Sequence, residues 1–292
     1  MTGSERAARL GAHIGALTEA GPRDPDNPPG IAAALDYLTS TLASYGYQAY
    51  QHHYGEQDHQ VNVIVEPGAD QGGGTLDLGA HWDTVAGSPG ADDNASGVAG
   101  LLEIAREFAA DPPARPVRLC FFAEEEAGGL PGSTTHVEAF VQRGEKVAAA
   151  MVLEMIGYCD RRPGSQQLPQ QAAQLLESAG VAAPDRGDFI ALVGDTAAGE
   201  LVLALRDAAE QLEPELPTMP LVVPAGALGD GARSDHAAYW RAGIPGLMIT
   251  DTANFRNPHY HRPTDTPGTL DLDFAAQVTT MVIAAVRGSQ KP

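Results

Sequence analysis

Residues 75–97 read TLDLGAHWDTVAGSPGADDNASG, a short strand-like run followed by a polar loop with several glycines. The run Thr75–Ala80 predicts a buried strand that places His81 at its carboxyl end. Asp93 lies in the loop, just before apolar residues recur at helical spacing over Ala95–Ala109. A strand, a polar loop and a helix in this order are typical of an α/β fold.

The same alternation of strands and helices continues along the chain. Later strands and a closing helix are predicted at Val117–Phe122, Ala148–Ile156, Gly246–Thr250 and Leu272–Val286. This order predicts a three-layer α/β/α sandwich around a mixed, mostly parallel sheet. Because no repeat or linker divides residues 1–292, we expect a single domain. Residues 157–188, rich in Gln, Pro and Gly, are expected to form a long irregular excursion over the surface.

The composition narrows the classes of function. The 292 residues include 18 Lys and Arg against 38 Asp and Glu, which gives a formal net charge of −20. So acidic a chain offers no basic surface for phosphates, which argues against binding of nucleic acids or of anionic membrane surfaces. The sequence contains no run of about 18 apolar residues, so no transmembrane helix is expected. The acidic excess either serves solubility alone or includes carboxylates that hold cations.

The first residues and the two cysteines give evidence on the cellular location of the protein. Charges at Glu5, Arg6 and Arg9 interrupt the opening segment, so no secretory signal is expected. Two cysteines, Cys120 and Cys159, make no disulfide framework, and Cys120 is expected to be buried in an apolar strand. We predict a cytoplasmic protein, or a secreted one if a signal has been removed. No pattern defines an oligomer, and a monomer is the starting expectation.

Residues of the types that bind metals gather after the predicted strands. In an open α/β sheet, ligands bind at the carboxyl ends of the strands. Carboxylate and imidazole groups are donors that zinc accepts. Each of these residues alone has an ordinary alternative as a surface or structural residue, but together they predict a cation site. The candidate metal ligands are His81, Asp93, Glu126, Glu154 and His261.

Neighbouring residues support this prediction. Asp83 is placed to accept the second ring N–H of His81, and Asp265 is placed to do the same for His261. Three consecutive acids, 124–126, follow an apolar strand. Crowding them is costly unless cations neutralise them, although a charged surface turn is the alternative.

Five motifs lie between Gly79 and Asp271, about two-thirds of the chain: GAHWDTVAGSPGADDNASG, VRLCFFAEEE, VLEMIGY, RSDHAAYWRAGIP and RNPHYHRPTDTPGTLD. In type and order, this set resembles the zinc aminopeptidases of the metallopeptidase M28 family. The resemblance implies a zinc-exopeptidase fold and two Zn²⁺ ions per chain, although other divalent transition metals suit the same ligands.

The resemblance also implies a role for each candidate ligand. Asp93 would bridge both ions, His81 and Glu154 would complete one site, and Glu126 and His261 would complete the other.

Three further residues receive roles in the implied reaction, hydrolysis of the N-terminal peptide bond by a metal-bridging water. Glu125 would be the general base that takes a proton from this water, and Tyr260 would help to stabilise the oxyanion. Arg233 is a candidate for contact with the substrate. Glu154 stands where many members have Asp, and AGGLPGS after Glu126 is longer than in compact members. Side-chain specificity is therefore not implied.

The substrate is expected to be a peptide or a small amide, and other reactions on such substrates are alternatives to the aminopeptidase. A glutaminyl-cyclase-like acyltransferase would use one zinc ion, and retention of both ligand sets argues against it. A metal-dependent amidase or deacylase acting on a small-molecule amide stays open. The M20 peptidases share a similar ligand order, but the 107 residues from Glu154 to His261 leave little room for their inserted domain. A non-catalytic binding protein would be expected to have lost a ligand or Glu125.

Among the other histidines, His259 could compete with His261 for the metal, although the HxxxD spacing to Asp265 favours His261. His236 is expected to be packed near the site. Surface positions are expected for His13, His52, His53, His59 and His136.

Overall fold

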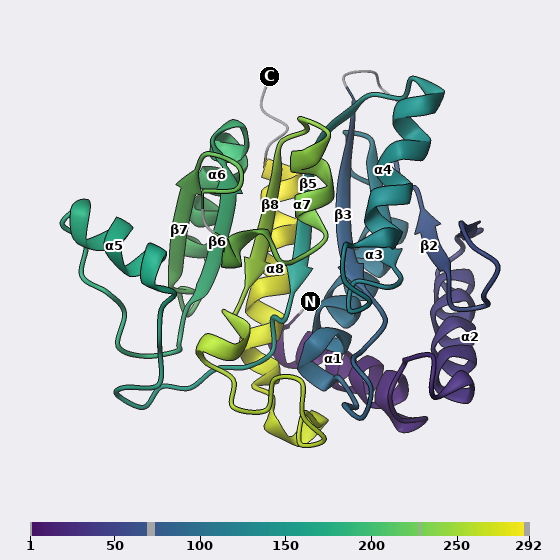
Figure 1. The fold of residues 1–292 in the computed structure, drawn as a ribbon, viewed down its shortest axis with the longest axis horizontal. Helices are drawn as coiled ribbons and strands as arrows, with labels where there is room; N and C mark the ends of the chain where they lie inside the picture. The colour runs from purple at the N-terminus through teal and green to yellow at the C-terminus, as the bar shows by residue number, and fades with distance from the viewer. Residues whose placement is uncertain (1, 69–73, 228, 289–292) are drawn as a thin grey trace.

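The computed structural model describes residues 2–68, 74–227 and 229–288, and its centre is an eight-stranded sheet (Figure 1). The strands lie in the order β1-β2-β4-β3-β5-β8-β6-β7. Their bounds are β1 Tyr50–His53, β2 Val61–Val65, β3 Thr75–His81, β4 Val117–Phe122, β5 Val147–Glu154, β6 Ile190–Asp195, β7 Thr218–Val223 and β8 Gly246–Thr250.

The sheet is mixed, with a parallel centre. The pairs β4–β3, β3–β5, β5–β8 and β6–β7 are parallel, whereas β1–β2, β2–β4 and β8–β6 are antiparallel. The predicted mixed, mostly parallel α/β sheet is therefore confirmed. Because β4, β3, β5 and β8 run in one direction, their carboxyl ends meet at one edge of the sheet. The loops that follow these four strands form the candidate site.

Helices cover both faces of the sheet. One layer contains α1 Gly3–Glu19, α2 Pro28–Ser44, α3 Gly97–Ala110, α6 Gly199–Glu210 and α8 Leu272–Gly288. The other contains α4 Pro131–Arg143 and α7 His236–Arg241, while α5 Gln170–Ser178 lies beyond β7 at one end of the molecule (Figure 1). The short helical turns are η1 Ala91–Ser96, η2 Thr196–Ala198, η3 Asp230–Ala232, η4 Ala253–Phe255 and η5 Pro267–Thr269. None of the described helices combines the length and apolar character needed to cross a membrane.

The apolar spacing after the Asp93 loop gives α3. The residues at that spacing are buried in the main core: Val98, Leu101, Leu102, Ala105 and Phe108. Full burial of each large side chain stabilises the fold by about 1.5–3 kcal/mol. Because α3 packs against β3 through this face, the helix start is held close to the end of that strand.

Residues 157–188 are less irregular than the sequence predicts. They contain α5, nine residues long, which buries Ala172 and Leu176 against the end of the sheet. The helix lies between Pro169 and Gly180 and shows only two buried apolar positions, too few for a clear helical period in the sequence.

The surface positions expected for two histidines are wrong. His13 and His136 are only 7% and 2% exposed, because each has an acidic partner inside the fold. His13 lies 3.7 Å from Glu103, and His136 lies 3.1 Å from Asp77. Of the other three, His53 is exposed, whereas His52 and His59 are partly buried. His236 and Cys120 are buried, as expected.

Candidate metal centre

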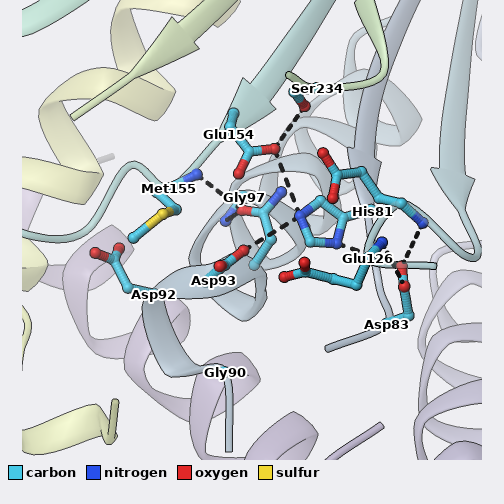
Figure 2. Close-up of polar contacts among 12 residues, drawn as sticks. His81, Asp83, Gly90, Asp92, Asp93, Gly97, Glu126, Glu154, Met155 and Ser234 are labelled. Atoms are coloured by element: carbon cyan, nitrogen blue, oxygen red, sulfur yellow. Dashed lines mark hydrogen bonds and ion pairs between the residues drawn. The ribbon is translucent and has the colours of Figure 1, made fainter. Parts of the chain in front are cut away.

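His81 stands at the centre of the cluster, at the last position of β3 and fully buried. Its Nε2 atom lies 3.3 Å from Oδ1 of Asp93 and 3.4 Å from Oε2 of Glu154 (Figure 2). Glu154 is the last residue of β5, which pairs with β3 in the sheet. The parallel strands β3 and β5 therefore bring two of the predicted ligands to Asp93.

Asp93 also faces a second group of donors. Its other carboxylate oxygen, Oδ2, lies 3.1 Å from Nε2 of His261. The same nitrogen lies 3.1 Å from Oε1 of Glu126. The two oxygens of Asp93 thus face two different His–carboxylate pairs, His81 with Glu154 and His261 with Glu126.

The spacing of these donors fits zinc. Bond lengths of about 2.0–2.2 Å at tetrahedral angles separate neighbouring N and O donors by about 3.4 Å. The separations measured here are 3.1–3.4 Å. Both ring nitrogens of His81 are buried without a hydrogen bond that meets normal criteria. A cation between the donors would satisfy Nε2, so the residues present fit two ions that share Asp93.

The acids of the cluster are held in an environment that favours a bound cation. Burial raises the pKa of Glu125, and burial together with Asp93 raises the pKa of Glu126 to about 7. Burial opposes charge on His261, but hydrogen bonds to Asp93 and Glu126 raise its pKa to about 9. In the metal-free protein the histidines thus take protons that metal binding would displace.

Asp83 takes the position expected behind His81. Its Oδ1 lies 3.4 Å from Nδ1 of His81. The same carboxylate accepts hydrogen bonds from the backbone N–H groups of Glu125 and Glu126, at 3.1 and 3.0 Å. Asp83 therefore connects the end of β3 to the loop that carries both glutamates.

Asp265 lies in a different place from the one expected behind His261. Its carboxylate accepts hydrogen bonds from the backbone N–H groups of Asp92 and Asp93, at 2.9 and 3.2 Å. It therefore orients the loop that carries Asp93 and not the ring of His261. The sequence distance from His261 to Asp265 did not show where this side chain points.

The three consecutive acids take different positions. Glu124 lies apart: its carboxylate accepts a hydrogen bond from the Tyr54 hydroxyl at 3.0 Å and lies 3.2 Å from His59. Donor atoms of Glu125 and Glu126 lie within 4.8 Å of one another and of His81. Glu124 has a φ of 59°, a left-handed conformation that turns the chain between the two orientations.

Ser234 and Asn94 support the ligands, and the sequence reasoning assigned neither. The Ser234 hydroxyl donates a 2.6 Å hydrogen bond to Oε2 of Glu154 (Figure 2). Asn94 donates to the backbone carbonyl of Leu153 and accepts from the N–H of Met155, at 2.9 and 3.0 Å. Asn94 therefore holds the Asp93 loop against the end of β5. Its position directly after Asp93 was the available signal in the sequence.

Arg23 is a further residue that sequence reasoning missed. It is 1% exposed, and its guanidinium donates hydrogen bonds to four backbone carbonyls. These belong to Trp82 at 2.6 Å, Pro89 at 2.7 Å, Gly90 at 2.9 Å and Leu17 at 3.3 Å. Trp82 follows His81, and Gly90 precedes the Asp93 turn. The Arg23 guanidinium therefore joins the two segments that carry His81 and Asp93.

Tyr260 and Arg233 lie at the mouth of the cluster. The Tyr260 ring stacks on His261, with 3.7 Å between ring centroids. Its hydroxyl oxygen accepts a 2.7 Å hydrogen bond from Arg233. Arg233 also donates to Asn254 and remains partly exposed. The pair presents a phenol and a guanidinium toward the cavity beside the metal cluster.

A cavity of about 350 Å³ opens from the cluster over β6, β7 and β8. This volume is within the range of about 300–1,000 Å³ seen for small-molecule sites. Acids of the metal cluster line one part of the cavity, whereas apolar side chains line the part over the strands: Ala191, Val193, Met219, Leu221 and Met248.

Residues 157–188 form one wall of this cavity through Leu168, Pro169 and Ala172. The wall is attached to the loop after β8. Gln166 donates to the Thr252 hydroxyl at 2.8 Å, and the N–H of residue 167 donates to the carbonyl of residue 255 at 2.8 Å. The excursion expected from sequence thus borders the candidate site.

The sheet and the donor cluster at its edge fit the class of α/β metallohydrolases, and comparison with known proteins identifies the family. The sequence model of Peptidase family M28 matches residues 62–286. The chain therefore belongs to peptidase family M28, and the prediction of a peptide-bond hydrolase of this family is confirmed.

Individual proteins agree with this assignment. YfbL of Escherichia coli (strain K12), an uncharacterised protein, is 36% identical over 284 residues, 92% of this chain and 84% of YfbL. Aminopeptidase YwaD of Bacillus subtilis (strain 168) is 28% identical over 230 residues, but the match covers 73% of this chain and only 41% of YwaD. The crystal structure of LapB from Legionella pneumophila superposes with a TM-score of 0.75 at 26% identity, covering 96% of this chain and 71% of LapB.

Proposed function

We propose that this chain is a two-zinc aminopeptidase that removes apolar residues from the N-termini of peptides. The observation that carries the proposal is the position of Asp93, whose two oxygens face separate His–carboxylate pairs at 3.1–3.4 Å. One shared carboxylate between two such pairs is the arrangement expected of a two-metal hydrolase. Membership of peptidase family M28 and the name of the relative YwaD support the same reaction.

Glu125 is the proposed general base. Bound zinc would lower the pKa of a coordinated water toward neutrality and polarise the peptide carbonyl. Glu125 lies beside His81 and Glu126, and its backbone N–H is held by Asp83. From this position its carboxylate accepts the proton of the attacking water and then delivers it to the departing amine.

Tyr260 and Arg233 are proposed to stabilise the tetrahedral oxyanion. Because Arg233 donates to the Tyr260 oxygen, the phenol hydrogen is free to point toward the cavity. A positioned O–H donor stabilises negative charge as it develops on the carbonyl oxygen. Stacking on His261 holds the phenol next to the metal cluster.

The cavity supports the substrate preference in the proposal. The carboxylates that line it, including Glu126 and Glu154, suit the positively charged α-amine of a peptide. The apolar surface over β6–β8 suits the first side chain, because burying apolar area is favourable and burying an unpaired charge is not. We therefore expect leucyl or phenylalanyl substrates to be preferred over aspartyl or lysyl ones.

Two alternatives remain within the same fold. A glutaminyl-cyclase-like enzyme would need one zinc ion, and an amidase or deacylase would accept a substrate without a free α-amine. The second His–carboxylate pair favours the two-metal reaction over the cyclase. The free thiols of Cys120 and Cys159 fit the predicted cytoplasmic location, which stays part of the proposal.

A substrate panel with and without a chelator tests the reaction. The panel contains aminoacyl amides with apolar or charged first residues, their N-acetylated forms and peptides that begin with glutamine. We expect release of apolar first residues, loss of this activity with chelator, and little cleavage of the acetylated forms. Cleavage of the acetylated forms would identify a deacylase, and cyclisation of glutamine without hydrolysis would identify the cyclase.

Metal content tests the two-ion claim. Because Asp93 is proposed to bridge both ions, Asp93→Asn is expected to lower the zinc content by about two ions per chain relative to the wild type. Elemental analysis after saturation with zinc measures the difference. Loss of about one ion would show a mononuclear site.

A further inference from the structure

A second group of metal-type donors lies away from the principal site, between the sheet and the layer of α4 and α7. It consists of Asp77 on β3, Cys120 on β4 and His136 on α4, whose donor atoms all lie within 4.8 Å of one another. Asp77 precedes His81 by four strand residues, roughly 13 Å along β3. We call Asp77, Cys120 and His136 the inner cluster.

The spacing of the inner cluster matches a zinc ion with one sulfur ligand. Zn–S and Zn–N bonds of about 2.3 and 2.0–2.1 Å at a tetrahedral angle separate S from N by about 3.6 Å, and N from O by about 3.4 Å. Nε2 of His136 lies 3.6 Å from Sγ of Cys120 and 3.1 Å from Oδ2 of Asp77. One nitrogen thus faces both of the other donors, as it would across a shared ion.

The hydrogen bonds around Asp77 leave part of its charge unmatched. Asp77 is 1% exposed, and its Oδ1 has no hydrogen-bond partner among the described residues. Nη1 of Arg118 lies 3.7 Å from this oxygen, beyond hydrogen-bond distance but within the range of an ion pair. The Nε and Nη2 atoms of Arg118 bind Glu66 at 2.9 Å and Glu145 at 2.7 Å. One guanidinium is thus shared among three carboxylates, and a bound cation would add to the compensation of the buried Asp77 charge.

The surroundings hold the donors in place. The Tyr239 hydroxyl donates a 2.8 Å hydrogen bond to Oδ2 of Asp77 and fixes the carboxylate. The rings of Phe122 and Phe140 lie 5.6 and 5.4 Å from the ring of His136, between centroids. Such outer contacts orient metal ligands and keep water away from them.

A cavity borders the inner cluster, and the donors would balance the charge of a bound ion. His136 lines a cavity of about 360 Å³ that it shares with residues of β1 and β2, including His52. Burial raises the pKa of the Cys120 thiol, so an arriving divalent ion must displace its proton. The resulting thiolate and the carboxylate of Asp77 would together neutralise the 2+ charge.

We propose that Asp77, Cys120 and His136 bind a divalent transition-metal ion, in addition to the ions of the principal site. The ion is zinc by the chemistry of its sulfur, nitrogen and oxygen donors. It connects α4 to β3 and β4 and has a structural role. This proposal does not depend on the proposed peptidase reaction.

Cobalt provides a probe that separates the two sites. The principal site offers only nitrogen and oxygen donors, whereas the inner cluster contains a cysteine. A thiolate bound to Co²⁺ gives a strong near-ultraviolet charge-transfer band that nitrogen and oxygen ligands do not give. We expect metal-free protein titrated with Co²⁺ to develop this band, saturating at about one ion per chain for a single site. Protein refolded in the presence of Co²⁺ is measured as well, because Co²⁺ can otherwise enter the buried cluster of the folded protein too slowly for the band to appear.

Matched variants assign the band. Cys120→Ser and His136→Gln should each remove it and lower the bound cobalt by about one ion per chain, as expected for a three-residue site. Cys159→Ser, which changes the other free cysteine, should leave it intact. Circular dichroism checks folding, and His136→Gln serves if Cys120→Ser does not fold. Absence of the band from the saturated wild type, or its persistence in a folded Cys120→Ser variant, would overturn the proposal.

Discussion

Two groups of buried acids in this protein have opposite surroundings. Glu103 on α3 is fully buried, paired with Arg9 at 2.9 Å and with Arg106 at 3.2 Å. Burial opposes its charge, but its hydrogen bonds to His13 and Arg9 lower its pKa to about 2. Glu125 and Glu126 at the sheet edge instead have raised pKa values, through burial and neighbouring acids.

The difference shows how a cation site is recognised within an acidic chain. Glu103 is an acid that the protein itself neutralises with guanidinium groups. The ion pairs of Asp93, Glu126 and Glu154 are made with His81 and His261, which metals also bind. The net charge of −20 does not distinguish the two groups, whereas the kind of partner does.

The largest effect is expected from Glu125→Gln. Loss of the proposed base should lower kcat by up to about 10⁴-fold, within the range for general acid–base catalysis. Zinc content should change little, and the metal-free variant should unfold at or above the wild-type temperature, because burial already raises the pKa of Glu125 and glutamine cannot ionise at this unfavourable position. Initial rates measure kcat, elemental analysis measures zinc content, and calorimetry measures the unfolding temperature. The matched control is Glu124→Gln, and equal loss of activity in both variants would contradict the assignment of the base.

Arg23→Met tests whether the buried Arg23 guanidinium positions the two backbone segments or acts as a counter-ion. Removal of its donors leaves buried carbonyls unsatisfied, and we expect a loss of about 3–5 kcal/mol in the free energy of unfolding, the range for breaking a buried charged contact. Zinc affinity, measured by competition with a chelator, should fall because Trp82 and Gly90 lose their common anchor.

Arg23→Lys separates the two explanations. Lysine keeps the charge but cannot reach four carbonyls with the geometry of a guanidinium. A positioning role predicts weak zinc binding in both variants. Normal zinc affinity in Arg23→Lys would show that charge alone matters.

A smaller effect is expected from Glu103→Gln, and it should depend on pH. The pKa of Glu103 is lowered from 4.5 to about 2 in the folded protein, so its charge stabilises the fold fully above pH 4.5. This contribution, about 3 kcal/mol by linkage, is lost as the pH falls from 4.5 through about 2. The variant should be less stable than the wild type at neutral pH and should approach it near pH 2.

Urea unfolding of the metal-free protein at a series of pH values measures this difference. Exposed Glu177→Gln on α5 is the matched control and should change stability little. Peptidase activity at neutral pH should remain near the wild-type value in Glu103→Gln. A constant difference between the curves from pH 4.5 to 2 would show that the ion pairs of Glu103 are not responsible.

The donor cluster could be predicted from sequence because its residues follow strands directly. His81 ends β3 and Glu154 ends β5, so the parallel arrangement of these strands is enough to bring them together. Glu126 and Asp93 follow β4 and precede α3, within short motifs. These local patterns predicted both the sheet and the positions of the candidate ligands.

Features that depend on distant contacts could not be predicted in the same way. Arg23 acts on carbonyls up to 67 residues away, and backbone carbonyls carry no sequence signal. Asp265 was assigned to His261 by proximity in sequence, but its partners lie more than 170 residues earlier. His136 has an acidic partner 59 residues away, so its burial had no local signature.

The wall formed by residues 157–188 has a consequence for how this protein can change over evolution. The segment contributes Leu168 and Ala172 to the cavity but none of the donors near Asp93. Its hydrogen bonds to residues 252 and 255 attach it to the loop after β8, and further hydrogen bonds join it to residues 92, 229 and 271. Insertions, deletions or exchanges of this segment would alter which substrates are accepted while the chemistry is inherited unchanged. Substrate range and reaction are thus encoded in separate parts of the chain, and one can diverge among relatives while the other is kept.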